Sequence, residues 1–422
     1  MTVVQGFFDW FFGLGSIVFV PIIMFVLCMG FRGGIAKSLR SALYMGIGLA
    51  GLGLIIDYSV AAMTPVVEGL TNHLGLNFSL IDIGYGNVSA AWSWPGVVAV
   101  ILGILLINFV MVMLKLTKVL WVDMWNIWHG EFIAGMMWAL TGNAAVGVGC
   151  GLVLLVISMK LADYHAKKMQ EFNGLEGIAV VASSAAFTAT FAQGVMFIIN
   201  KIPGLRDLNA DSGTIKDKFG IFGEMSVIGA IMGIILGILA GFDFTNTAQL
   251  AIKLAAVLVV LPKMLSILAE GIIPISTILS RFMKEKFPGR ELYIAVDPAI
   301  LLGDPSVMSS AILMYPIAIL VAAVLPGCNF LPIASLASLP YWIGGMVPYT
   351  KGNIVHTVIC AALWIIPAAL IASALAPICT TLCANTGLFV DEIANGAMFT
   401  NWEEGGNLLL WLMVQISHMF GL

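Results

Sequence analysis

Apolar stretches long enough to cross a lipid bilayer recur along the chain. A transmembrane helix needs about 20 mostly apolar residues to cross a hydrocarbon core of about 30 Å. Such segments form two sets, separated by a polar region near residues 205–224. The first set covers residues 11–30, 41–63, 96–114, 124–141 and 143–161, and the second covers 225–242, 248–268, 306–325, 331–349 and 353–376. The pattern predicts an all-α polytopic membrane protein with about ten transmembrane helices.

Two further apolar stretches, residues 174–200 and 385–420, are interrupted by polar residues. We interpret each as a re-entrant hairpin followed by a return helix. Lipid offers no hydrogen-bond partners, so irregular backbone at membrane depth is stable only where protein buries it or where it lines a cavity. We therefore expect both hairpins to lie inside the protein.

The composition agrees with a membrane protein. Hydrophobic residues make up 60% of the 422 residues and charged residues 10%, and the mean hydropathy is +1.02. Soluble domains contain roughly half and roughly a quarter, respectively, so a soluble globular enzyme is excluded. The net charge of −4 gives no sign of a nucleic-acid partner. All six cysteines lie in apolar stretches without a Cys-x-x-Cys motif, which predicts packing roles, with no metal and no cofactor.

Basic residues follow a regular pattern along the predicted spans. Every lysine and arginine except Lys253 and Lys263 falls in a loop that an alternating topology places on one side of the membrane. The opposite loops, 65–95, 242–247 and 326–330, contain no basic residue. Because cytoplasmic loops are enriched in lysine and arginine, we expect the basic loops to be cytoplasmic and the N-terminus to lie outside.

The two halves of the chain also resemble each other. Aligning residue 42 with residue 251 brings Pro65 onto Pro274, and after an insertion near residues 284–290 it brings Asp82 onto Asp297. Each predicted half holds five spans and one hairpin, and this odd number of crossings turns the second half upside down. Inverted repeats of this kind are typical of secondary-type transporters, whose substrate binds at the repeat interface. The alternative is chance similarity between apolar helices.

Four blocks of sequence carry a more specific signal. They are Val122–His129, Leu175–Ala179, Lys218–Glu224 and Val296–Gly303. With these blocks the chain resembles the galactitol-type membrane component, enzyme IIC, of the bacterial phosphoenolpyruvate-dependent sugar phosphotransferase system, within the ascorbate/galactitol superfamily. The resemblance covers nearly the whole chain.

The resemblance implies an elevator-type transporter that forms a homodimer in the bacterial inner membrane. A polyol would be carried inward and phosphorylated by a phosphocysteine on a cytosolic IIB partner, which IIA supplies. No catalysis is expected from this chain alone. The implied first repeat is 1–204, with scaffold helices 11–30 and 41–63 and a core at 82–200 that contains a hairpin near 174–190. A cytoplasmic linker at 205–224 follows. The implied second repeat is 225–422, with scaffold helices 225–242 and 248–268 and a core at 291–422 that contains a hairpin near 385–407.

The chain departs from the family pattern at two places. Residues 181–184 read Val-Ala-Ser-Ser where the family pattern continues Pro-His-Gly-Thr, and Asp304 stands where the family has a histidine. Both places are expected to contact substrate. The substrate is therefore left open between galactitol and a related polyol or sugar.

Polar residues within the predicted membrane region are the candidates for substrate binding. An ionisable residue there is costly unless paired or hydrated, and a neutral polyol needs hydrogen-bond donors and acceptors. The candidates are Asp82, Tyr85, Asn126, His129, Glu176, Ser183, Ser184, Asp297 and Asp304. His129 or Asp297 is the possible base near the accepting hydroxyl.

Each candidate also has a structural interpretation. Asp297 and Asp304 precede prolines and are suited to cap helices, and Asp82 could cap a loop. His129 and Tyr85 could be interfacial side chains, and the two serines could cap exposed backbone. In the second hairpin, a solvated external loop is the interpretation for most of the polar residues Asp391, Glu392, Asn395, Glu403, Glu404 and Asn407.

A different function class remains possible on the sequence alone. The same repeat would suit an ion-coupled secondary transporter of a sugar, polyol or ascorbate-like substrate, with Asp297 or Glu176 as the proton or cation site. A channel fits less well, because the hairpins suggest alternating access.

Overall fold

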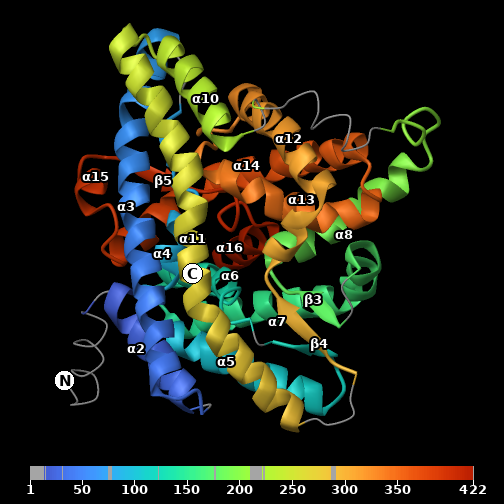
Figure 1. The fold of residues 1–422 in the computed structure, drawn as a ribbon. Helices are drawn as coiled ribbons and strands as arrows, with labels where there is room; N and C mark the ends of the chain where they lie inside the picture. Colours follow the sequence, from blue (N-terminus) through green and yellow to red (C-terminus); the bar gives the residue numbers. More distant parts are fainter. Residues whose placement is uncertain are drawn as a thin grey trace.

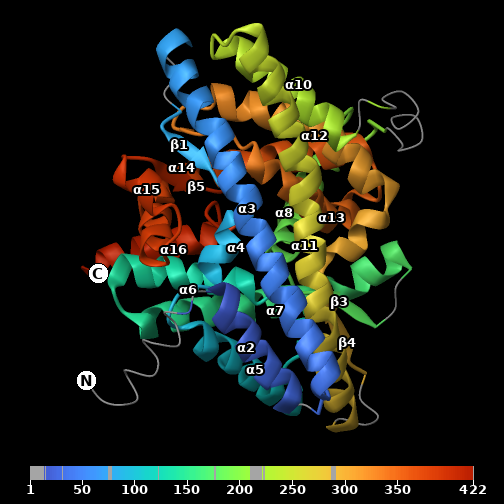
Figure 2. The same ribbon diagram turned by 60° about the vertical axis from the view of Figure 1, so that its left-hand side comes forward.

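Two long helices, α3 (Ile35–Leu74) and α11 (Phe244–Lys286), pack against each other along one side of the protein in the computed structural model (Figures 1 and 2). Helix α2 (Ser16–Gly30) packs on α3, and α10 (Met225–Leu239) packs on α11. These helices cover the segments expected to form the scaffold. The structure describes residues 14, 16–30, 32–74, 78–121, 123–174, 177–209, 221, 224–286 and 291–421, so most of the expected linker at 205–224 lies outside the described residues.

Glycines on one face of α10 explain its close packing on α11. Gly229, Gly233 and Gly237 recur at every fourth position of α10. A Cβ atom built on Gly229 would lie 2.6 Å from the Cα of Ala255, and one on Gly233 would lie 2.4 Å from the Cα of Ala251. Only glycine allows the backbones of the two helices to approach this closely, as in other membrane helix pairs.

The remaining elements form a second group beside the long helices (Figure 1). Within it, α6 packs on α7, α8 on α13, and α12 on α14. The helical elements of this group are α4 (Gly86–Ala91), α5 (Val97–Met113), α6 (Trp128–Thr141), α7 (Ala144–Asn173), α8 (Ser183–Ile199), η2 (Pro298–Gly303), α12 (Pro305–Val324), η3 (Ala334–Ser338), α13 (Leu339–Thr350), α14 (Ile354–Asn385), α15 (Val390–Ala394) and α16 (Leu408–Met419).

Short parallel strands connect the two halves of the chain. Strand β1 (Leu80–Asp82) pairs with β5 (Met398–Thr400), with Asp82 opposite Thr400. Strand β4 (Tyr293–Val296) pairs on one side with β2 (Val119–Leu120) and on the other with β3 (Ile178–Val180). Each sheet therefore joins strands from both halves of the sequence. The segments with most of the polar candidate residues directly follow the ends of β1, β3, β4 and β5.

The structure confirms a mostly helical protein suited to a membrane. Four helical segments of the described chain are long and apolar enough to cross a bilayer: Ile35–Met63, Ala144–Asn173, Pro305–Val324 and Ile354–Asn385. Shorter apolar helices accompany them at Pro21–Gly30, Val97–Met113, Ser183–Ile199, Ser226–Leu239, Phe244–Val260 and Leu408–Met419.

Several expected elements differ in the structure. The prediction of an all-α chain missed the five short strands, because two to four extended residues leave no periodicity to detect. The predicted spans at 124–141 and 331–349 are wrong as continuous spans: their α-helices begin only at Trp128 and Leu339. With 14 and 12 residues, α6 and α13 extend only about 21 and 18 Å, short of a bilayer core. The expected hairpins contain strands β3 and β5, which lead towards α8 and α16.

An exposed ion pair lies at the N-terminal ends of strands β2 and β4. Lys118 Nζ lies 2.8 Å from a carboxylate oxygen of Glu291, just outside paired strands β2 and β4. This hydrogen bond raises the pKa of Lys118 and lowers that of Glu291. Both side chains are well exposed, so the pair adds little to stability.

Candidate functional site

Asn126 and His129 lie where the irregular segment before α6 becomes helical, and both are buried. The amide nitrogen of Asn126 donates to Asp297 Oδ2 at 3.0 Å and to Asp123 Oδ2 at 2.6 Å. Two acceptors on this nitrogen determine the orientation of the amide. Asn126 Oδ1 therefore accepts a hydrogen bond from His129 Nε2, at 3.1 Å.

The other nitrogen of His129 faces a carboxylate from the far end of the sequence. His129 Nδ1 lies 2.8 Å from Glu404 Oε1, and both side chains are at most 2% exposed. Ser183 also donates to Glu404 Oε1, and Asn407 Nδ2 donates to Glu404 Oε2 at 2.8 Å. The two oxygens of Glu404 thus accept from Ser183 and Asn407, and His129 Nδ1 shares Oε1 with the Ser183 hydroxyl.

Asp297 reaches this network from the end of β4. Its Oδ1 accepts from the backbone N–H of Ala299 at 2.7 Å and so caps η2, with Pro298 at the first helical position. Its Oδ2 accepts from Asn126. One oxygen of Asp297 therefore caps η2 and the other contacts Asn126, while its role in substrate binding stays a prediction.

Tyr85 adds an aromatic wall beside these groups. It is buried, its hydroxyl lies near the Glu403 carboxylate, and its ring meets those of Trp128 and Tyr341 edge-on, with centroids 6.2 and 6.1 Å away. The adjacent carboxylates Glu403 and Glu404 thus contact different partners. We define the polar cluster as Tyr85, Asp123, Asn126, His129, Ser183, Asp297, Glu403, Glu404 and Asn407.

Asp82 makes its hydrogen bonds to a different set of groups. Its carboxylate accepts from Ser335 N at 2.7 Å, Ser335 Oγ at 2.5 Å and Gly84 N at 3.0 Å. Ser335 is the second residue of the 3-10 helix η3, and its carbonyl accepts from the indole nitrogen of Trp402 at 2.9 Å. The structure thus gives Asp82 the capping role that was its alternative interpretation.

The remaining predicted residues are not members of the polar cluster. Asp304 is the N-cap of α12 and accepts from Ser306 N at 2.7 Å. Ser184 is buried in the first turn of α8, next to Ser183. Glu176 lies outside the described residues.

The interpretation of the second hairpin as an external loop is wrong for three of its polar residues. Glu403, Glu404 and Asn407 are 8%, 1% and 8% exposed, whereas Asp391 and Glu392 on α15 are exposed as expected. The segment 401–407 is rich in glycine and acidic residues and is typical of a loop in sequence. One feature of the sequence could have indicated that this segment is buried. It follows a short apolar stretch, β5, as the segment with Ser183 follows β3.

The cluster offers hydrogen-bond donors and acceptors in close alternation without any basic side chain apart from His129. Carboxylates, an amide, a hydroxyl and an imidazole can exchange their mutual hydrogen bonds for bonds to a neutral, hydroxyl-rich molecule. Within the described residues, no group of three or more His, Cys, Asp or Glu side chains has the arrangement of a metal site.

A helical protein with apolar spanning helices and a buried polar cluster built from both halves is of the membrane-transport class. The sequence profile described as "PTS system sugar-specific permease component" matches residues 10–392, and the chain belongs to this family of the phosphotransferase system. It is 32% identical over 406 residues to the "PTS system galactitol-specific EIIC component" of Escherichia coli (strain K12), which covers 96% of this chain and 89% of that protein. It is also 32% identical over 414 residues to a "Putative permease IIC component" of the same strain, covering 98% of this chain and 94% of the relative. The family indicated by the four sequence blocks is confirmed.

Proposed function

We propose that this permease component binds a polyol, galactitol or a related sugar alcohol, at the polar cluster and carries it inward for phosphorylation by a cytosolic IIB partner. The observation that carries the proposal is the continuous hydrogen-bonded path Asp297–Asn126–His129–Glu404–Ser183. Its members come from both halves of the chain and are almost completely shielded from solvent, apart from the half-buried Asp297. The name of the galactitol-specific relative supports the substrate class.

A polyol would bind by taking over hydrogen bonds that the cluster now makes with itself. Ser183 and Asn407 occupy the two oxygens of Glu404, and a vicinal diol can replace both of these donors. The remaining oxygens of Asp297 and Glu403 can accept further hydroxyl protons, while Tyr85 and Trp128 cover the carbon skeleton. His129 or Asp297 would orient the accepting hydroxyl and take its proton as the phosphoryl group arrives.

The proposal includes an inverted repeat, which matching contacts in the two halves support. Asp82 accepts from the N–H two residues on, Gly84, and from Ser335; Asp297 accepts from the N–H two residues on, Ala299, and from Asn126. Each acid therefore caps its own turn and contacts the opposite half of the chain. Asp82 contacts the segment before α13, and Asp297 contacts the segment before α6. Strand β1 likewise pairs with β5, and β4 pairs with β3, across the halves.

The same proposal extends to the mechanism and the assembly. The long helices α2, α3, α10 and α11 would form the static scaffold of a homodimer, and the group carrying the polar cluster would move against it as an elevator. The basic loops would face the cytoplasm, with the N-terminus outside, in the bacterial inner membrane. The ion pair Lys118–Glu291, at the N-terminal ends of β2 and β4, would lie on the face towards IIB.

The test is uptake of radiolabelled galactitol, other hexitols, pentitols and ascorbate into cells that express this chain with its cognate IIA and IIB. The internal label is analysed for phosphate. Phosphorylated label that disappears when IIB is omitted would support the proposal and name the substrate. Free sugar that accumulates without IIB, and that is lost on uncoupling the membrane, would instead support the ion-coupled secondary transporter.

A further inference from the structure

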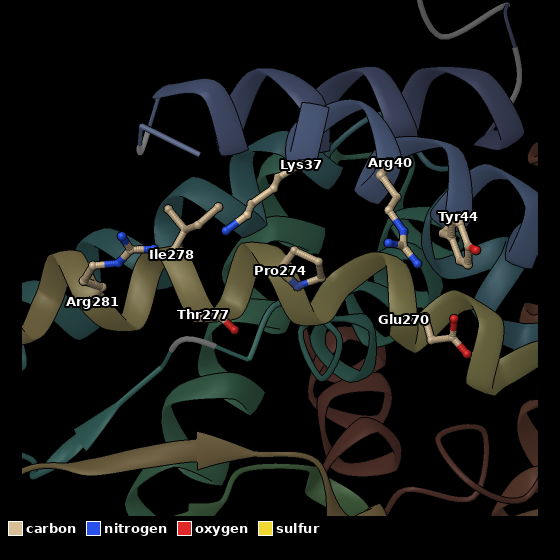
Figure 3. A pocket seen from close by; sticks show the side chains of 8 residues that line it. All are labelled: Lys37, Arg40, Tyr44, Glu270, Pro274, Thr277, Ile278 and Arg281. Atoms are coloured by element: carbon tan, nitrogen blue, oxygen red, sulfur yellow. The ribbon is translucent and has the colours of Figure 1, made fainter. Parts of the chain in front are cut away.

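A pocket of about 470 Å³ opens between α3 and α11, away from the polar cluster. Its walls are formed by Lys37, Arg40 and Tyr44 on α3 and by Glu270, Pro274, Thr277, Ile278 and Arg281 on α11. Figure 3 shows Lys37 and Arg40 extending from α3 towards α11. The spacing of Lys37, Arg40 and Tyr44 places them along one face of α3.

Helices α3 and α11 pack closely against each other beside this pocket, and this contact keeps the pocket walls in place. Ser41 Oγ donates to the carbonyl of Gly271. A Cβ atom built on Gly271 would lie 2.6 Å from the backbone nitrogen of Met45. Because backbone meets backbone here, the distance between the helices, and hence the width of the pocket, is set by packing.

The pocket concentrates uncompensated positive charge. Lys37, Arg40 and Arg281 share it with one carboxylate, Glu270. Within the described part of the chain, none of the three cations forms an ion pair, although Arg40 stacks on the Tyr44 ring at 5.2 Å. By contrast, the exposed cations Lys118, Lys160, Lys167 and Arg206 each have a carboxylate partner.

Exposed apolar side chains alternate along α3 with the basic residues of the pocket. Ile35, Leu39, Leu43 and Ile47, on another face of α3, are 67%, 50%, 56% and 55% exposed. Pro274 and Ile278 supply an apolar lining inside the pocket. A ligand that matches these surroundings carries an anionic group and an apolar chain in one molecule.

We propose that this pocket binds the phosphate headgroup of an anionic membrane phospholipid, with its acyl chains along the exposed apolar face of α3. Guanidinium groups bind phosphate oxygens bidentately, and a basic pocket between transmembrane helices is a suitable headgroup site. A free phosphate ester shares the headgroup chemistry, but it would gain nothing from the apolar border.

The test uses the full chain, purified in a mild detergent and exchanged into nanodiscs that contain phosphatidylglycerol, phosphatidylcholine or a mixture. Native mass spectrometry counts the lipids that remain bound. The wild type should retain phosphatidylglycerol over phosphatidylcholine by about tenfold or more. The double variant Arg40→Gln, Arg281→Gln removes two cations and should reduce this preference by about fivefold for each charge removed. This factor corresponds to an attraction of about 1 kcal/mol between each basic residue and an anionic lipid.

Two further variants control the measurement. Lys167→Gln with Arg206→Gln removes the same charge from exposed sites outside the pocket and should leave lipid retention unchanged. Glu270→Gln removes the carboxylate found among the described lining residues and should strengthen retention of phosphatidylglycerol. A gain of this kind cannot result from misfolding, so it keeps the test decisive if the arginine variant is unstable.

Other outcomes would overturn the proposal. Equal retention of the two lipids, or an equal loss in the control variant, would mean that the pocket selects no headgroup. Displacement of the lipid by an equal concentration of soluble glycerol 3-phosphate would assign the pocket to free phosphate esters. A change in oligomeric state with unchanged lipid retention would assign it to contact between two copies of the chain.

Discussion

The imidazole of His129 and the carboxylate of Glu404 lie 2.8 Å apart although 275 residues separate them in the sequence. His129 is the second residue of α6 in the first half of the chain, and Glu404 lies between β5 and α16 in the second half. Together with the contacts Asn126–Asp297 and Ser183–Glu404, this contact joins the two halves at the polar cluster. Its loss should therefore affect substrate binding and not only local packing.

We expect Glu404→Gln to reduce uptake of the phosphorylated sugar by about tenfold or more. The amide keeps the volume of the side chain but replaces one acceptor oxygen with a donor NH2, so a buried donor such as Ser183 or Asn407 loses its acceptor, at a cost of about 1–3 kcal/mol. The measurement is labelled uptake, normalised to the amount of protein in the membrane. The matched control is Glu392→Gln on the exposed α15, which should keep wild-type uptake. Equal uptake by both variants would remove Glu404 from the site.

Asp297 and Asp304 form a second matched pair. Each is an N-cap followed by proline and accepts from the N–H two residues on, but Asp297 also accepts from Asn126. Asparagine caps helices nearly as well as aspartate, so both Asn variants should fold. We expect Asp297→Asn to lose most of the uptake and Asp304→Asn to retain it. A severe defect in Asp304→Asn would restore the substrate-binding role that the sequence left open for this residue.

The sequence was sufficient to predict much of the site because its residues lie in local patterns. Asn126 and His129 are three residues apart, and Asp297 precedes a proline where a helix must restart. Both features are visible without any tertiary structure. Four of the nine predicted residues, Asn126, His129, Ser183 and Asp297, lie on one hydrogen-bonded path, and Tyr85 lies beside it.

Features that depend on distant contacts could not be predicted in this way. The strands β1 to β5 are two to four residues long, and each exists only because a segment from the other half supplies its hydrogen bonds. Glu404 is buried by the packing of the same segments, while its neighbours Gly405 and Gly406 are typical of an exposed turn. The late starts of α6 and α13 within their predicted spans could not be predicted either, because buried irregular backbone can be as apolar as a helix.

Asp82 should contribute to stability more than to transport. We expect the unfolding temperature in detergent to fall in the order wild type, Asp82→Asn, Asp82→Ala. Alanine leaves the buried donors of Ser335 and Gly84 without an acceptor, at about 1–3 kcal/mol for each. Asparagine retains one acceptor oxygen, and its uptake per folded molecule should stay near that of wild type. Strong loss of uptake with an unchanged unfolding temperature would instead make Asp82 a substrate ligand.

The glycines of α7 provide a test of how α6 is positioned. A Cβ atom built on Gly151 would lie 2.5 Å from the carbonyl oxygen of Gly130, which is the residue next to His129, whereas Gly149 has open space around it. Gly151→Ala should push α6 away from α7, displace His129 from Glu404, and reduce both the unfolding temperature and the uptake.

Gly149→Ala makes the same chemical change two residues away on the same helix. It should keep full uptake and the wild-type unfolding temperature or a slightly higher one, because alanine favours a helix over glycine by about 1 kcal/mol. The comparison of the two variants by labelled uptake and thermal unfolding isolates the effect of the helix contact from that of the substitution. If Gly151→Ala retained wild-type uptake, the placement of His129 would not depend on the close contact of α6 and α7, and the polar cluster would have to be held by its hydrogen bonds alone.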